Sequence, residues 1–90
     1  MEWKNMSLIV RYNGKMNVIG KTLKEYRIKN DLSYEVLSAK LELLGISIHK
    51  QSLYDIENDK RTVKDYELFG LAYILGIDIN DLFKDMRKSI

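Results

Sequence analysis

One stretch, residues 33–58, constrains the fold most strongly, because its pattern predicts two helices joined by a glycine turn. Leu37, Leu41 and Leu44 recur at the i, i+4 and i+7 positions that share one helical face. Gly45 follows the last of them, at the place where a helix most often ends in a left-handed residue. The stretch therefore predicts a first helix that packs along its leucine stripe and ends at the glycine.

The second helix of this stretch, predicted near residues 49–58, is short and has two strong core positions, Leu53 and Ile56. At about 100° per residue these two positions define the inward direction of the helix. The side chains that then point outward are those of Gln51, Tyr54, Asp55 and Asn58, with Lys50 at the edge of the same face. Two helices about one glycine turn form the helix-turn-helix unit, whose second helix can lie in the DNA major groove.

Short motifs along the chain extend this unit into a family resemblance. They are Ile19-Gly20-Lys21, Leu32-Ser33, Leu37 to Leu41, Ile56-Glu57-Asn58 with Lys60-Arg61, Leu75-Gly76-Ile77 and Asp81-Leu82-Phe83. In this order and spacing the chain resembles the lambda-repressor-like (Xre-type) helix-turn-helix family over Val18 to Phe83. Glu42-Leu43-Leu44 and Ile46-Ser47 lengthen the connection around the glycine, which resembles one branch of that family.

The resemblance implies an all-α fold, a compact five-helix lambda-repressor-like DNA-binding domain with an extended N-terminal arm. The predicted helices lie near residues 18–30, 33–44, 49–58, 65–75 and 79–88, so the domain spans 18–88 and the arm 1–17. Within the arm, Ser7–Tyr12 has strand propensity and Asn13-Gly14 is a turn signal. Because a lone strand lacks a partner in a helical domain, this piece is predicted either to lie on the core as an arm or to pair with its twin in a dimer.

Composition narrows the class of protein. Ninety residues with a net charge of +2 are enough for one domain with one modest core. Residues 1–30 hold seven Lys/Arg against two acids, whereas the rest hold eight against eleven, so positive charge is concentrated where an arm or first helix could touch phosphates. The chain has no cysteine, no signal peptide and no apolar run of transmembrane length, which predicts a cytoplasmic protein without membrane contact.

The sequence shows no catalytic constellation, so we expect no enzyme activity. His49 is the only histidine, and without cysteines it has no partners for a metal site, so neither a metal nor another cofactor is predicted. The acidic pair Asp78 and Asp81 is sufficiently explained as a cap for the last helix. Gly70, within the fourth predicted helix, suggests a close approach of neighbouring elements.

Four residues are predicted to read DNA bases: Lys50, Gln51, Tyr54 and Asp55. A glutamine can bond an adenine edge bidentately, a lysine donates to guanine, and an aspartate accepts from the cytosine amine. Tyr54 can instead pack on a thymine methyl group or reach a phosphate, and Asp55 can instead orient Lys50 or Gln51. The resemblance implies base contacts in the first two turns of this helix.

Five residues are predicted to contact phosphates: Tyr34, His49, Lys60, Arg61 and, more weakly, Lys21. The resemblance places Tyr34 at a helix N-terminus, where free backbone N–H groups favour an anion; the alternative is a plain surface tyrosine. His49 stands where relatives have a small capping residue, so it is predicted to cap the helix or to meet a phosphate. The resemblance also implies a structural ion pair between Arg27 and Glu57, with a phosphate contact by Arg27 as the alternative.

Two functions follow from these residues. The first is a sequence-specific DNA-binding transcriptional regulator, a repressor, acting as a homodimer on two half-sites of double-stranded DNA about one turn apart. The second is a protein-interaction module, antitoxin-like or an adaptor, that kept the fold and binds a protein partner instead of DNA. The acids Asp55, Glu57 and Asp59 favour the second function, because their charge opposes phosphates.

Overall fold

The computed structural model describes residues 12–88, and within this range it is all-helical. Its elements are η2 (Tyr12–Gly14), α1 (Gly20–Lys29), α2 (Tyr34–Leu43), α3 (Lys50–Glu57), α4 (Asp65–Leu75), η3 (Ile79–Phe83) and α5 (Lys84–Lys88), where η marks a 3₁₀ segment. The predicted all-α class is confirmed, and the predicted helix boundaries agree with the observed ones to within two residues. Residues 7–11 of the predicted strand lie outside the described residues.

The last predicted helix differs from the observed one, because residues 79–88 divide into η3 and α5. The Asp78 carboxylate accepts from the amide of Asn80, while the Asp81 carboxylate accepts from the amide of Asp78. The Asp81 amide also donates to the Asp78 carbonyl at 2.9 Å. These bonds satisfy the first turn with i to i+3 geometry, so the segment starts as a 3₁₀ helix.

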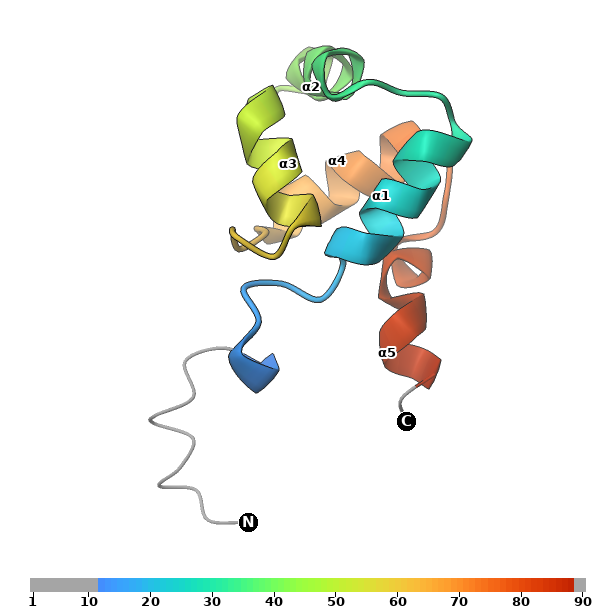
Figure 1. The fold of residues 1–90 in the computed structure, drawn as a ribbon. Helices are drawn as coiled ribbons and strands as arrows, with labels where there is room; N and C mark the ends of the chain where they lie inside the picture. The colour runs from blue at the N-terminus through green and yellow to red at the C-terminus, as the bar shows by residue number, and fades with distance from the viewer. Residues whose placement is uncertain (1–11, 89–90) are drawn as a thin grey trace.

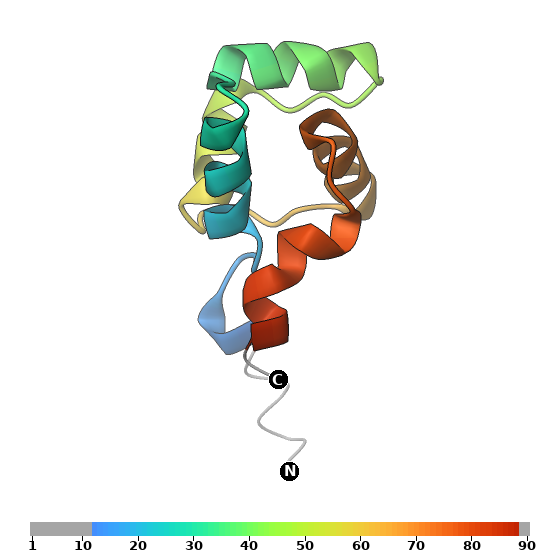
Figure 2. The same cartoon turned by 90° about the vertical axis from the view of Figure 1, so that its right-hand side faces the viewer.

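The helices enclose one core (Figures 1 and 2). Helix α2 crosses one end of the molecule, α1 and α3 lie along one side, and α4 lies on the other side (Figure 2). Segments η2 and α5 both lie toward the end opposite α2, and Figure 1 shows their ribbons apart from one another. None of the described helices is long and apolar enough to cross a membrane.

Residues from every major element fill the core, including the lengthened connection between α2 and α3. The fully buried aliphatic side chains include those of Leu23, Leu37, Leu41, Leu53, Ile56, Leu71 and Leu82. Ile46 and Ile48 of the connection are also buried, so the extra residues add core volume. Gly70 in α4 lies against the side chains of Ile46 and Leu41, which is the predicted close approach.

Four helices end with the same backbone geometry. After α1, α2, α3 and α4 the left-handed residues are Asp31, Gly45, Asp59 and Gly76, with φ values of 55°, 80°, 59° and 69°. In each case the amides of that residue and the next donate back to carbonyls of the last turn. This arrangement satisfies carbonyls that a helix end leaves unpaired. Two of the four ends use aspartate, which tolerates this conformation better than most side chains but less well than glycine.

Candidate nucleic-acid interface

Helix α3 separates a buried face from an exposed face. Leu53, Ile56 and Glu57 point into the core, whereas Lys50, Gln51 and Tyr54 are exposed and Asp55 is half-buried. The exposed side chains are polar or aromatic and lie within two turns. An exposed polar strip on a helix whose other side is fixed in the core is suited to contact a partner surface.

Two of the exposed side chains have acidic neighbours that limit their orientation. The Gln51 side-chain amide donates to the Asp55 carboxylate at 3.1 Å, one turn along the helix. The Lys50 ammonium lies 3.9 Å from the Glu35 carboxylate in α2, and both groups are exposed. The Gln51 bond is the arrangement predicted as the alternative role of Asp55. It leaves the Gln51 carbonyl and its second N–H available for another partner.

The predicted pair Arg27 and Glu57 meets inside the fold. The Arg27 Nε donates to Glu57 Oε2 at 2.6 Å and Nη2 donates to Oε1 at 3.2 Å. The Glu57 side chain is fully buried and that of Arg27 is 12% exposed. Arg27 Nη1 donates in addition to the Leu32 carbonyl at 2.9 Å. The hydrogen bond with Glu57 raises the pKa of Arg27, and the pair ties α1 to the end of α3.

Tyr34 belongs to this same cluster, which differs from the phosphate contact predicted for it. Its hydroxyl donates to Glu57 Oε1 at 2.7 Å, and the Arg27 guanidinium lies 4.0 Å from its ring centroid. Burial and this hydrogen bond raise the pKa of Tyr34. A tyrosine has one O–H proton to donate, and here a buried carboxylate holds it. The phosphate role therefore does not fit this geometry.

Arg61 is the second of the residues predicted to contact phosphates whose side chain instead bonds to another residue of the fold. Its guanidinium donates to both carboxylate oxygens of Glu67, at 3.0 and 2.9 Å. The Glu67 side chain is 3% exposed, and it also accepts from the Lys64 amide at 2.9 Å. Burial by itself raises the pKa of Glu67, but the bonds from Arg61 and the Lys64 amide, with the charges of both residues, outweigh it and lower that pKa. The pair joins the loop after α3 to the start of α4.

The remaining phosphate candidates are exposed. The Lys60 ammonium lies 5.6 Å from the ring centroid of Tyr54, beside the exposed strip of α3. His49 directly precedes α3, and its side chain makes no capping hydrogen bond, so the predicted cap is absent. Lys21 lies near the start of α1, at the end of the molecule that holds η2 and α5. Of the five candidates, Lys60 and His49 therefore lie close to the exposed strip.

Asn17, which the sequence assigns to the arm without a role, bonds to three segments of the fold. Its side-chain amide donates to the carbonyls of Ile56 at 2.9 Å and Arg61 at 2.8 Å. Its side-chain oxygen accepts from the amides of Ile19 and Gly20 at the start of α1. Each partner is a backbone group, and the two carbonyls are about forty positions away. No local pattern signals such contacts.

Asp59 also bonds to residues 16–17. One carboxylate oxygen accepts from the amide of Met16 at 2.8 Å and from the amide of Asn17 at 3.1 Å. The predicted boundary after residue 17 therefore does not separate an arm from a domain, because residues 16–17 are bonded to the loop after α3. A Cβ atom on Gly20 would collide with the Ile56 carbonyl, so the backbones of α1 and α3 are in direct contact close to these hydrogen bonds.

The described residues contain no group of three or more histidine, cysteine, aspartate or glutamate side chains that could hold a metal ion.

Two helices are joined through a glycine, and the second has one face buried in the core and a polar face exposed to solvent. This arrangement defines a helix-turn-helix protein. A family model described as helix-turn-helix matches residues 23–82, and the chain belongs to the lambda-repressor-like (Xre-type) branch of that family. It contains a DNA-binding helix-turn-helix domain. No curated protein and no solved structure matches the chain significantly.

Proposed function

We propose that this protein is a sequence-specific DNA-binding transcriptional regulator that inserts α3 into the major groove. The observation that carries the proposal is the exposed strip of Lys50, Gln51 and Tyr54 on a helix whose opposite face is buried. The B-DNA major groove admits one helix, and its base edges present donors and acceptors to polar side chains. Base contacts by these residues and by Asp55 are part of the proposal.

Gln51 is the residue best prepared to read a base. Its bond to Asp55 fixes the side-chain amide while leaving one N–H and the carbonyl free. These two groups match the N7 acceptor and N6 donor of adenine. Lys60 and His49 lie at the two ends of α3, where they can contact phosphates on either side of the groove.

The acids that favoured a protein-interaction module have internal partners. Glu57 is held by Arg27 and Tyr34, Asp59 accepts from the amides of residues 16 and 17, and Asp55 accepts from Gln51. Structural partners account for their presence at the end of α3 without a protein ligand. This supports the DNA-binding function over the alternative.

The proposal includes a homodimer and repression. One α3 reaches only a few base pairs, so useful affinity favours two copies on half-sites about one DNA turn apart. Binding across a promoter blocks polymerase by occupying the site, so repression needs no contact beyond those of the DNA-binding domain.

Selection of bound sequences from a random DNA library tests the proposal, with Gln51→Ala and Leu53→Ala as contrasting variants. Gln51→Ala is expected to cost about 1–3 kcal/mol at one or two base pairs and to leave the melting temperature nearly unchanged. Leu53→Ala is expected to lower stability by roughly 2–5 kcal/mol, because it empties core volume. A wild-type selection without an enriched motif contradicts sequence-specific binding. An unchanged motif for Gln51→Ala removes that residue from base reading.

A further inference from the structure

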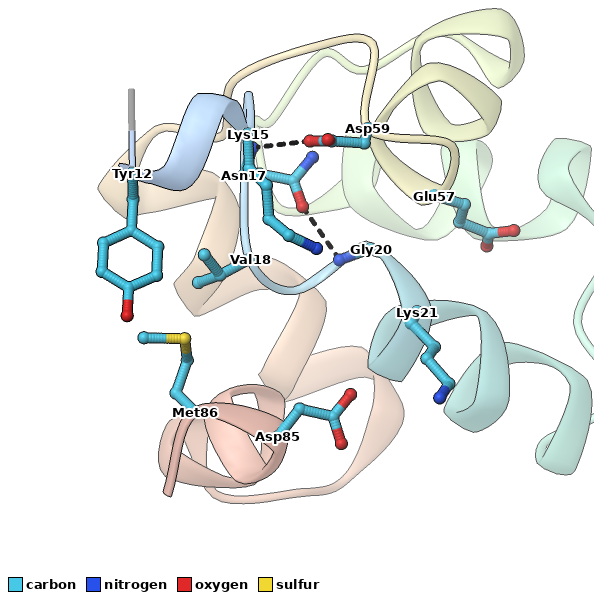
Figure 3. Close-up of a pocket in the computed structure, with 10 residues that line it drawn as sticks. All are labelled: Tyr12, Lys15, Asn17, Val18, Gly20, Lys21, Glu57, Asp59, Asp85 and Met86. Atoms are coloured by element: carbon cyan, nitrogen blue, oxygen red, sulfur yellow. Dashed lines mark hydrogen bonds between the residues drawn. The ribbon is translucent and has the colours of Figure 1, made fainter. Parts of the chain in front are cut away.

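A cavity of about 360 Å³ lies at the end of the molecule opposite α2 (Figure 3). Its wall is formed by η2 and the segment after it, the start of α1, the end of α3 with its following loop, and α5. The lining residues are Tyr12, Lys15, Asn17, Val18, Gly20, Lys21, Glu57, Asp59, Asp85 and Met86. Its volume lies within the range of about 300–1,000 Å³ that is typical of small-molecule sites.

Most of this wall lies outside the part of the chain that matches the family. The family match begins at residue 23 and ends at residue 82, and of the lining residues only Glu57 and Asp59 fall inside it. The segments before and after the matched region therefore meet to form the cavity. Tyr12, Lys15, Asn17, Asp85 and Met86 also lie outside the wider family resemblance over Val18 to Phe83, so half of the wall comes from the flanking segments.

The charges around the cavity are unevenly compensated. Three carboxylates line the wall: Glu57 is paired with Arg27, one oxygen of Asp59 accepts from two backbone amides, and Asp85 also has a partner. Lys15 and Lys21, in contrast, have no ion-pair partner within residues 12–88. Figure 3 shows the Lys15 side chain extending along Asn17 toward Gly20, inside the wall. Lys15 thus extends an ammonium group along the wall, and Lys21 supplies a second one from the start of α1, on the side of Asp85 (Figure 3).

The other side of the cavity is apolar. Tyr12, Val18 and Met86 lie together there (Figure 3). An aromatic ring, a branched aliphatic group and a thioether form a surface that favours a hydrocarbon or aromatic body, and a methionine adapts to the shape of such a body. A ligand that fits both sides carries a negative group and a compact apolar part.

We propose that this cavity binds a small organic anion, an aromatic carboxylate or a phosphate monoester with an apolar body. Bound there, the ligand lies beside the hydrogen bonds between residues 16–17 and Asp59. It therefore stabilises the position of residues 12–19 against the end of α3. The regulatory part rests on the proposed DNA-binding function: the ligand is expected to raise DNA affinity, and DNA to raise ligand affinity by the same factor.

The site is tested without DNA by NMR titration of the full chain. The probes are benzoate and phenyl phosphate, with benzamide as the neutral counterpart of benzoate. Up to about 10 mM, which saturates a site with a dissociation constant near 1 mM, the anions are expected to shift the amides of residues 12–21 and 84–86. Benzamide is expected to bind more weakly. Absence of a saturable shift with both anions, or saturable shifts only elsewhere, overturns the site.

Two double variants identify the cations. Lys15→Ala with Lys21→Ala is expected to weaken binding of the anions about tenfold. Lys24→Ala with Lys29→Ala removes the same charge from exposed positions of α1 that do not line the cavity, and it is expected to leave binding unchanged. Equal effects of the two double variants overturn the assignment, because they indicate a response to net charge alone.

The coupling is tested by DNA titrations with and without the anion that binds more tightly. Binding of the anion with unchanged DNA affinity overturns the regulatory part and leaves the site intact. Failure of the free protein to bind any DNA contradicts the proposed function, and the NMR result then still decides whether the cavity is a ligand site.

Discussion

At the scale of single residues, two buried carboxylates hold α3 and the loop after it against the rest of the fold. Glu57 accepts from Arg27 and Tyr34, and Glu67 accepts from Arg61 and the Lys64 amide. A buried carboxylate is costly unless it is paired and hydrogen-bonded, so each depends on its arginine. The two clusters flank the end of α3, one on the side of α1 and the other on the side of α4.

Arg27→Ala is predicted to destabilise the protein by about 3–5 kcal/mol, because it leaves the buried Glu57 carboxylate without its cation. Tyr34→Phe removes one of the hydrogen bonds to the same group, and a smaller loss of about 1–3 kcal/mol is expected. Chemical denaturation measures both free energies of unfolding. Lys24→Ala, an exposed change in the same helix, serves as the control. A loss below about 1 kcal/mol for Arg27→Ala shows that the pair acts like an exposed one.

Glu67 is predicted to make stability depend on acid. Its pKa in the fold lies below the ordinary value of 4.5, so below that pH the unfolded chain binds the proton more readily than the folded one. The contribution of Glu67 is therefore fully present above pH 4.5 and is lost as the pH falls through its folded pKa. Urea unfolding of wild type and Glu67→Gln across this range measures the difference. The stability gap between them is expected to narrow in acid, and a constant gap contradicts the assignment.

At the scale of elements, the helices could be predicted because their signals are local. Leu37 and Leu41 of the predicted leucine stripe are buried in α2, whereas Leu44 lies just after the helix and is 40% exposed. The glycines after α2 and α4 stand within two residues of the helix ends that they mark. Asp31 and Asp59 end α1 and α3 in the same left-handed geometry but give weaker signals than glycine. The start of η3 as a 3₁₀ turn was not predicted, since the same aspartate pair is compatible with either kind of helix.

The site could be predicted only in part, because some of its contacts join elements that are distant in the sequence. Helical periodicity placed Lys50, Gln51 and Tyr54 outward, and the structure has them exposed. The internal partners of Tyr34 and Arg61 lie on other elements, so an exposed role was assigned to both. A signal for Arg61 did exist: Glu67 stands four residues before Leu71 on the inward face of α4 and needed a cation nearby.

The two aspartate helix ends provide a matched pair of substitutions. Asp31→Gly relieves the strain of a non-glycine residue in the left-handed region. We expect it to raise the free energy of unfolding slightly, by no more than about 1 kcal/mol. Asp59→Gly relieves the same geometry but removes the acceptor of the Met16 and Asn17 amides, so it is expected to be worse than Asp31→Gly by about 1–2 kcal/mol. Thermal unfolding of both variants gives the comparison. Equal changes in melting temperature contradict the anchoring role of Asp59.

At the scale of the whole molecule, one of the two cationic side chains that follow α3 is exposed and the other is held in an ion pair. Lys60 is exposed beside the outward strip, whereas the neighbouring Arg61 is held by Glu67. Lys60→Ala is therefore predicted to weaken binding to all DNA sequences alike and to reduce the salt slope by about one, with little change in melting temperature. Arg61→Ala is predicted to lower the melting temperature markedly, because it leaves Glu67 buried and unpaired.

Fluorescence anisotropy at several salt concentrations, together with thermal unfolding, separates these two outcomes. Lys29→Ala controls for loss of one positive charge at an exposed site away from α3. If Lys60→Ala leaves the salt slope at the wild-type value, that lysine does not touch a phosphate in the complex.

The two faces of α3 also have a consequence for how such a protein diversifies. Leu53, Ile56 and Glu57 tie the helix to the core, while the side chains of Lys50 and Gln51 are exposed and contact only Glu35 and Asp55 among charged groups. Substitutions at the two exposed positions can therefore accumulate without loss of the fold. Under the proposed function, a duplicated copy of this chain can acquire a new operator through a few changes on one face, and the ancestral copy keeps its own.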